Sequence, residues 1–216
     1  MSRPVIDNID CTFDTEGMRP IRDYVLMEVW KRGMTSGGIH LTNRYSGTPC
    51  SLGKVLRVGR CIDNPFSLED FPMDIAVGEV VMTMDYMGEK MHLREGAHRL
   101  VKTHGIWAKV KADPNTYEIS EIEPRMSCVI VRPMDEEKTK GGLILPDGDK
   151  EWKNRWAKVV KVGPGVMHTK SRKRIALEVS PGDEVLMTRY AGAEVQVGGE
   201  WLRIVDESDI HCVKQD

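Results

Sequence analysis

A long internal repeat is the feature that most constrains how this chain of 216 residues can fold. Residues match at a constant offset, 104 positions between Val25 and Val129, and no gap is needed from the first matched pair to the last. One register kept through four separate segments indicates two homologous domains rather than chance matches between glycines. Further matched pairs are Gly37-Gly38 with Gly141-Gly142, Leu41 with Leu145, Val58-Gly59 with Val162-Gly163, Gly78 with Gly182, Gly88 with Gly192, and Arg99 with Arg203.

The repeat also sets the expected limits of the domains. It predicts one domain over residues 18–112 and a second over 122–216, with residues 1–17 as an N-terminal extension. The stretch between them, residues 113–121, begins with Asp113-Pro114-Asn115, a composition typical of a turn-rich linker.

The apolar stretches of each copy are short, rich in Val, Ile and Leu, and separated by Gly and Pro. This spacing predicts strands, since no segment keeps a helical period for three turns. Each copy is therefore expected to be a small all-β barrel. Gly78 and Gly182 suit tight turns before a strand, because glycine accepts positive φ. The predicted strands are Tyr24–Val29, Lys54–Val58, Glu79–Met84, Cys128–Val131, Lys158–Val162 and Glu184–Thr188.

Charge and composition exclude several functional classes. Lys and Arg total 31 against 33 Asp and Glu, and this balance argues against a nucleic-acid-binding protein with a broad basic face. No apolar run approaches the roughly 18 residues that span a bilayer. The residues show no nucleotide-binding or hydrolase motif, so neither a cofactor nor enzymatic activity is expected.

The cysteines and the N-terminus bear on the compartment. Five cysteines without a CxxC motif favour reduced thiols over a disulfide framework or a zinc site. The first residues hold no apolar h-region, so a cytoplasmic protein is expected, with a plastid protein after transit-peptide removal as the alternative. His92, His98 and His104 recur every six residues and are expected to be scattered surface residues rather than metal ligands.

The order of motifs in the second copy resembles the chaperonin-10 family, the GroES-like co-chaperonins. The resemblance covers the whole second domain. In the first copy it is carried by Tyr24–Val29, Gly37–Leu41, Gly53–Gly59 and Val77–Val81, whereas its expected last strand, Lys102–Trp107, departs from the acidic pattern of the family. The motifs of the second copy are Cys128–Pro133, Gly141–Pro146, Ala157–Gly165, Val179–Leu186 and Asp206–His211.

The resemblance implies two tandem GroES-like β-barrels with long mobile loops. It also implies a ring-shaped homo-oligomer that caps a chaperonin ring in an ATP-dependent complex and assists protein folding, the chaperonin and not the lid hydrolysing ATP. Rings of the family hold an odd number of domains, which whole two-domain chains cannot supply. Either one domain type forms the ring, or the number of domains differs.

A loop in each copy is the expected chaperonin-binding site. The second runs from about Asp135 to Trp156 and places three aliphatic residues after two glycines. Exposed aliphatics are costly unless a partner groove receives them, although the same residues would also suit a hairpin feeding a buried strand. Their recurrence in both copies favours partner binding. The predicted binding residues are Gly37, Gly38, Ile39 and Leu41 in the first copy and Gly141, Gly142, Leu143, Ile144 and Leu145 in the second.

The two copies differ in charge after the second strand. The resemblance implies that this region forms the roof of a dome, where Glu69 and Asp70 fall opposite Lys173 and Arg174 in the repeat. Charge runs are usually solvated faces, yet unlike roofs would favour ordered assembly. A second functional hypothesis is a structural or assembly protein, for instance of viral origin, that keeps the barrels without chaperonin activity.

Overall fold

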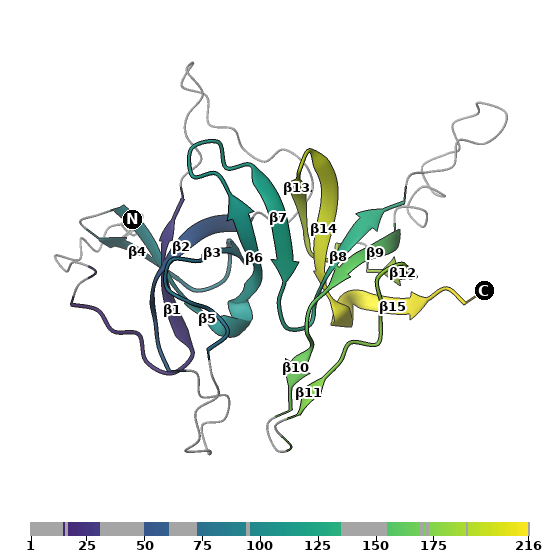
Figure 1. The fold of residues 1–216 in the computed structure, drawn as a ribbon, viewed down its shortest axis with the longest axis horizontal. Coiled ribbons are helices and arrows are strands. Elements are labelled where there is room, and N and C mark those ends of the chain that lie inside the picture. The colour runs from purple at the N-terminus through teal and green to yellow at the C-terminus, as the bar shows by residue number, and fades with distance from the viewer. Residues whose placement is uncertain are drawn as a thin grey trace, which may run out of the picture. The chain divides into compact units, whose positions relative to one another are not determined.

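The computed structural model describes residues 15, 17–30, 50–60, 73–93, 96–134, 155–168, 171, 173–188 and 190–215. They form two compact units (Figure 1). Apart from Cys50, which is grouped with the second unit, the described residues up to Ile106 belong to the first and those from Trp107 onward to the second. Both units are all-β over these ranges, as the sequence predicts, and their only helical turns are two 3-10 turns. No helix within the described part of the chain has the length and apolar character needed to cross a membrane.

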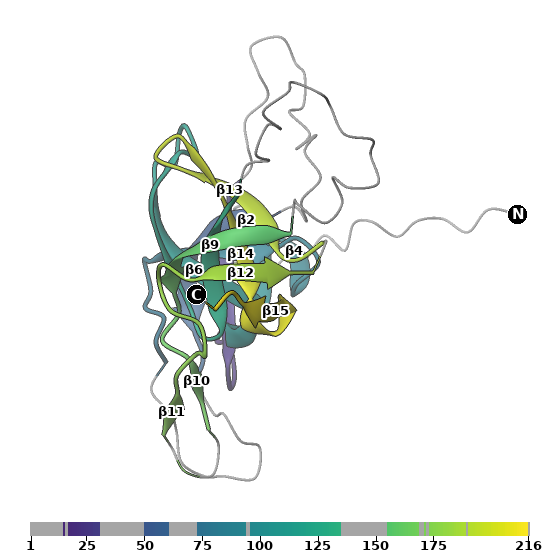
Figure 2. The same ribbon diagram turned by 90° about the vertical axis from the view of Figure 1, so that its right-hand side faces the viewer.

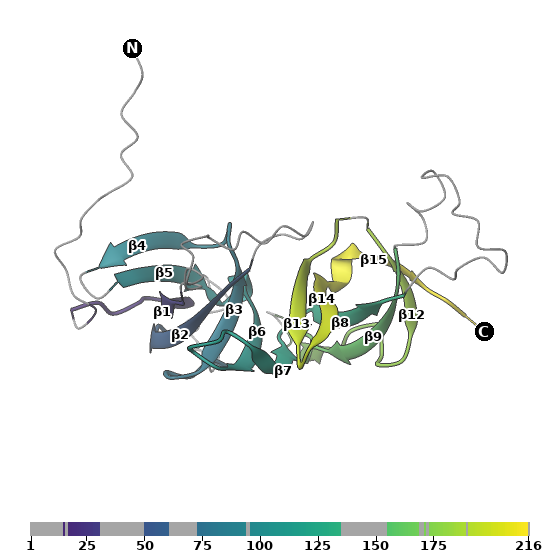
Figure 3. The same ribbon diagram turned by 90° about the horizontal axis from the view of Figure 1, so that it is seen from above.

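The first unit contains five strands in the hydrogen-bonded order β3-β2-β1-β5-β4. Strand β1 lies between β2 and β5 and is antiparallel to both, and the strands β4, β5 and β1 lie side by side in Figure 3. The apolar core gathers Val25, Val55, Val81 and Val101 with other buried residues. The strand bounds are β1 Tyr24–Val29, β2 Cys50–Val58, β3 Val80–Met84, β4 Glu89–Leu93 and β5 Gly96–Lys102.

The second unit has the order β15-β12-β9-β8-β14-β13-β7-β6, with β13 parallel to β7 and the other pairs antiparallel. Its core contains Val129, Val159, Val185 and Val205, the repeat counterparts of the four valines in the first core. The strands are β6 Ile106–Ala112, β7 Ile119–Pro124, β8 Cys128–Pro133, β9 Trp156–Val162, β12 Glu184–Met187, β13 Ala193–Val197, β14 Glu200–Asp206 and β15 Ile210–Val213, and a separate two-stranded sheet joins β10 Val166–Met167 to β11 Arg174–Ile175.

The repeat holds at the level of strand register. Val25 faces Val101 in the first unit, and Val129 faces Val205 in the second. A β-bulge follows the second residue of the register in both, at Leu26/Met27 and at Ile130/Val131. The two copies therefore share one backbone plan, as the constant offset predicts.

The predicted glycine turns are confirmed. Gly78 and Gly182 have φ values of +94° and +103°. The Gly78 amide donates to the Val55 carbonyl and the Gly182 amide to the Val159 carbonyl, each at 2.8 Å. The turn that precedes β3 is thus repeated before β12, and both turns need a residue that tolerates a positive φ.

Two expectations from the sequence are wrong in detail. The segment Lys102–Trp107 is not a continuous strand, because a 3-10 turn, η1 (Thr103–Gly105), separates β5 from β6. The same turn recurs in the second unit as η2 (Glu207–Asp209), where the Asp206 carboxylate accepts from the Ser208 amide. His98 is 2% exposed and lies in β5, so it is a buried residue rather than a surface one.

The predicted linker lies within a hairpin. Its first residue, Asp113, accepts hydrogen bonds through Oδ1 from the amides of Asn115 (2.7 Å) and Thr116 (3.1 Å). These bonds hold the pKa of the Asp113 carboxyl below its usual value. Strands β6 and β7 then pair across this turn, from Ala112 opposite Ile119 to Ala108 opposite Pro124. The domain limits 18–112 and 122–216 stay a prediction.

Candidate functional site

All nine predicted chaperonin-binding residues fall within residues 31–49 or 135–154, called here the first and second loop segments, which lie outside the described residues. What the structure shows is how the strands on either side hold the ends of these segments. The described part of the candidate site is therefore its two bases, the strand ends that flank the first and second loop segments.

The base of the second loop segment is a hydrogen-bonded end of the β8–β9 hairpin. The Met134 amide donates to the Trp156 carbonyl at 3.0 Å, and Pro133 faces Ala157 in the register. The Arg155 carbonyl accepts from the Met187 amide of β12 at 2.9 Å. Of the two tryptophans in this stretch, Trp156 is thus the first residue of β9, and Trp152 lies outside the described residues.

The base of the first loop segment has the same construction. The Trp30 amide donates to the Leu52 carbonyl at 2.9 Å, and Val29 faces Gly53. A Cβ at Gly53 would lie 2.3 Å from the Glu28 carbonyl oxygen, so β1 and β2 approach as closely as they do only because residue 53 has no side chain. Ala157 occupies the equivalent position in the second copy and is fully buried.

These bases determine where the apolar residues can reach. Leu143–Leu145 lie near the middle of the second loop segment, and Ile39–Leu41 lie near the middle of the first. About ten residues separate each midpoint from its anchored ends, so the midpoint can extend up to about 35 Å from the strands.

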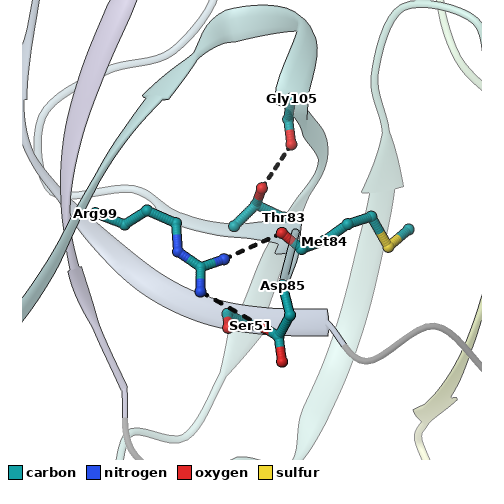
Figure 4. A network of polar contacts seen from close by, with 6 residues as sticks. All are labelled: Ser51, Thr83, Met84, Asp85, Arg99 and Gly105. Atoms are coloured by element: carbon teal, nitrogen blue, oxygen red, sulfur yellow. Dashed lines mark hydrogen bonds and ion pairs between the residues drawn. The ribbon is translucent and has the colours of Figure 1, made fainter. Parts of the chain in front are cut away.

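A polar network around the buried Arg99 side chain lies beside the first base, and no sequence motif indicated it (Figure 4). The Arg99 side chain, 3% exposed as a residue, donates through Nη1 to the Met84 carbonyl at 3.0 Å and lies 3.7 Å from Asp85 Oδ1. Ser51, the second residue of β2, donates to the same carboxylate. Burial lowers the pKa of the Arg99 guanidinium, and the Asp85 carboxylate opposes this effect.

The equivalent arginine of the second copy has a different partner. Arg203 donates through Nη2 to Glu194 Oε1 at 2.9 Å, and both side chains are partly exposed, 16% and 26%. In the repeat, Ser51 corresponds to Arg155 and Asp85 to Arg189. Arg99 and Arg203 match in the repeat, but their partners come from residues that differ between the copies.

This difference supplies a matched prediction. Arg99→Ala should lower the free energy of unfolding by about 2 kcal/mol, because Met84 loses a buried donor and the aliphatic stem leaves a gap. Arg203→Ala should cost about 1 kcal/mol or less, because its ion pair is partly solvated. Urea unfolding of the two variants side by side measures the difference. Equal losses would show that the buried network adds nothing beyond an ordinary ion pair.

Metal binding finds no support in the described part of the chain, where no group of three or more His, Cys, Asp or Glu side chains could hold an ion. Among the described cysteines, Cys128 is buried, and desolvation raises the pKa of its thiol to about 12. At neutral pH this thiol stays protonated, which makes it a poor nucleophile.

Comparison with known proteins agrees with the repeat. The family model described as the chaperonin 10 Kd subunit matches twice, over residues 17–110 and 121–214. These matches cover well over half of the sequence. The chain belongs to the chaperonin-10 family, in a tandem form.

Curated relatives match one copy. The chain is 42% identical over 96 residues to the co-chaperonin GroES of Symbiobacterium thermophilum, a match that covers 44% of this chain and 97% of that protein. It is 46% identical over 94 residues to the co-chaperonin GroES of Coprothermobacter proteolyticus, covering 43% of this chain and 94% of that one. The co-chaperonin GroES of Chlorobium luteolum is 46% identical over 93 residues, covering 43% and 96%.

Proposed function

We propose that this chain is a cytoplasmic co-chaperonin. It forms a ring-shaped homo-oligomer and caps a GroEL-like chaperonin ring through its loop segments, in a complex that depends on ATP. It binds no nucleic acid and no membrane, and the ATP is hydrolysed by the chaperonin. The observation that carries the proposal is the repeated loop base in a member of the chaperonin-10 family. Each base is a hydrogen-bonded hairpin end, and each segment holds apolar residues near its midpoint, Ile39 and Leu41 in the first and Leu143–Leu145 in the second.

The binding chemistry follows from the residues. Burying each of Leu143, Ile144 and Leu145 in a groove yields about 1.5–3 kcal/mol. Ordering each backbone residue costs about 1–2 kcal/mol. A single loop therefore binds weakly, and several loops held on one ring gain affinity because the first contact raises the effective concentration of the others. Weak individual contacts let the whole lid be released when the chaperonin changes state.

The two loop segments contribute unequally in this proposal. His40 stands where the second copy has Ile144. In an extended segment alternate side chains point in opposite directions, so Ile39 and Leu41 can enter a groove while His40 faces away. The second segment supplies three consecutive aliphatics and is the stronger contact.

The proposal is tested by native mass. The purified chain is mixed with a GroEL-type chaperonin ring, with ATP, with ADP and without nucleotide, and the masses are read by native mass spectrometry. Mass addition to the chaperonin only with nucleotide is the expected result. A stable oligomer that ignores the chaperonin under all three conditions contradicts the proposal and favours a structural or assembly protein.

A further inference from the structure

The β10–β11 hairpin is an outlying element of the second unit. It projects away from the strands of that unit in two perpendicular views (Figures 1 and 2). Its two strands pair Val166 with Ile175 and Met167 with Arg174. Val166 and Ile175 are 38% and 55% exposed, so this cross-strand pair presents apolar surface to solvent.

Local bonds give the hairpin a defined geometry. The His168 amide donates to the Lys173 carbonyl at 2.9 Å, and Arg174 Nη1 donates to the Gly165 carbonyl at 3.0 Å. Gly165 has a φ of +87°, and a Cβ there would lie 1.9 Å from the Ile175 carbonyl oxygen. The two strands can therefore close at this end only over a glycine.

The hairpin and the turn that joins its strands carry a single sign of charge. Residues 166–175 contain no acidic residue, and Lys173 and Arg174 are exposed. In the part of the chain that the structure describes, no carboxylate forms an ion pair with either of them. The basic residues of this stretch are Lys170, Arg172, Lys173 and Arg174.

The repeat counterpart of this hairpin has the opposite charge. Residues 61–72 of the first copy, which lie outside the described residues, contain Asp63, Glu69 and Asp70 and no basic residue. The same twelve residues include Phe66 and Phe71, large apolar side chains that could cover the exposed Val166–Ile175 pair. Opposite charge and apolar side chains thus occur together on matching segments of the two copies.

We propose that the β10–β11 hairpin is a docking surface for residues 61–72 of a second copy of this chain. First and second domains then alternate around the assembly, because like segments meeting each other would place acidic beside acidic and basic beside basic. The inference deepens the ring of the proposed function and rests on it. The test of this docking surface measures the native mass of the chain without a chaperonin. Loss of the docking contact and loss of chaperonin capping are therefore separate results, and either proposal can fail while the other holds.

Charge reversal tests the proposal in two chains. The first chain carries K170E, R172E and K173E and keeps Arg174 with its bond to Gly165. The second chain carries E69K and D70K. Each chain alone should require at least about tenfold higher concentration to reach the native mass of the wild type, since like charges now face each other. An equimolar mixture should recover the wild-type mass, because each altered segment then meets a complementary partner.

The mixture distinguishes contacts between chains from contacts within one. A single chain that carries all five changes should also assemble. If this chain recovers the mass and the mixture does not, the contact lies within one chain and the proposal is overturned. A control with K54E, K90E and K158E makes the same change in charge at exposed lysines outside the hairpin and should keep the wild-type mass.

Two further results would overturn the proposal. One is a wild-type chain that is monomeric at all concentrations. The other is unchanged mass in the K170E/R172E/K173E chain, together with loss of binding to a labelled oligonucleotide, which would make the hairpin a polyanion site. The wild-type assembly should also weaken as salt is raised, because the contact is made by exposed charges.

Discussion

A chain in which Leu143, Ile144 and Leu145 are all changed to serine is expected to lose capping of a chaperonin while keeping its fold and native mass. The loss follows from the proposed mode of binding, in which these three side chains provide most of the apolar contact of each second loop segment. Removing about 1.5–3 kcal/mol for each residue weakens one loop contact at least about a thousandfold. The contacts that remain, made by Ile39 and Leu41 of the first segments, are the weaker ones, and their avidity is not expected to hold the lid in place.

The fold should survive because both ends of the segment are held by strand pairing that the changes do not touch, with Met134 bonded to Trp156. Val160→Ser is the matched control, since it removes an apolar side chain that is 37% exposed on β9, outside both segments. It should cap as well as the wild type. Ile39→Ser with Leu41→Ser measures the share of the first segment, and a partial loss is expected. Capping by the triple serine chain at wild-type strength would remove the second segment from the site.

Gly192→Ala is expected to lower the free energy of unfolding by about 3 kcal/mol or more. Gly192 has a φ of +66°, and a Cβ there would lie 1.8 Å from the Ile204 carbonyl oxygen, in the middle of β14. That oxygen belongs to the backbone of a buried residue, so it cannot move without disturbing the pairing of β14 with β13 and β8. Urea unfolding measures the loss.

Gly182→Ala separates crowding from backbone strain. Gly182 also has a positive φ, +103°, but nothing lies within 4 Å of a Cβ placed there. Gly182→Ala should therefore lower the free energy of unfolding by only about 1–2 kcal/mol, which is the strain of holding a residue with a side chain in a left-handed conformation. Gly88→Ala, the first-copy counterpart of Gly192, meets the Leu100 carbonyl oxygen at 2.6 Å and should resemble Gly192→Ala. Equal losses at Gly182 and Gly192 would show that the close approach to Ile204 carries no cost.

The repeat made much of the fold predictable, because short apolar runs separated by glycines recur at one offset and form strands in both copies. The predicted strand Tyr24–Val29 matches β1 residue for residue, and Gly78 and Gly182 take the positive φ expected of them. The chaperonin-10 motifs carried the prediction further, to the family itself. The nine predicted binding residues lie outside the described residues, and their role stays a proposal.

Two other features, a turn and a buried arginine, could not be predicted from the spacing of apolar residues. At the Thr103–Gly105 turn the buried Thr83 hydroxyl donates to the Gly105 carbonyl at 2.7 Å, a tertiary contact that no local pattern indicates. The burial of Arg99 depends on Asp85 and Met84, two residues of another strand end, and a charged residue in a strand is ordinarily predicted to face solvent. In both cases the hydrogen-bond partner is distant in sequence.

The shared strand register has a consequence for folding. β1 and β8 offer nearly the same apolar face to their partners, Val25 to Val101 and Val129 to Val205, so an unfolded chain has two candidate partners for each central strand. Duplicated domains with this property are prone to misassembly by strand exchange. Synthesis from the N-terminus reduces that risk, because β5 leaves the ribosome long before β14 and can close the first barrel before a competitor exists.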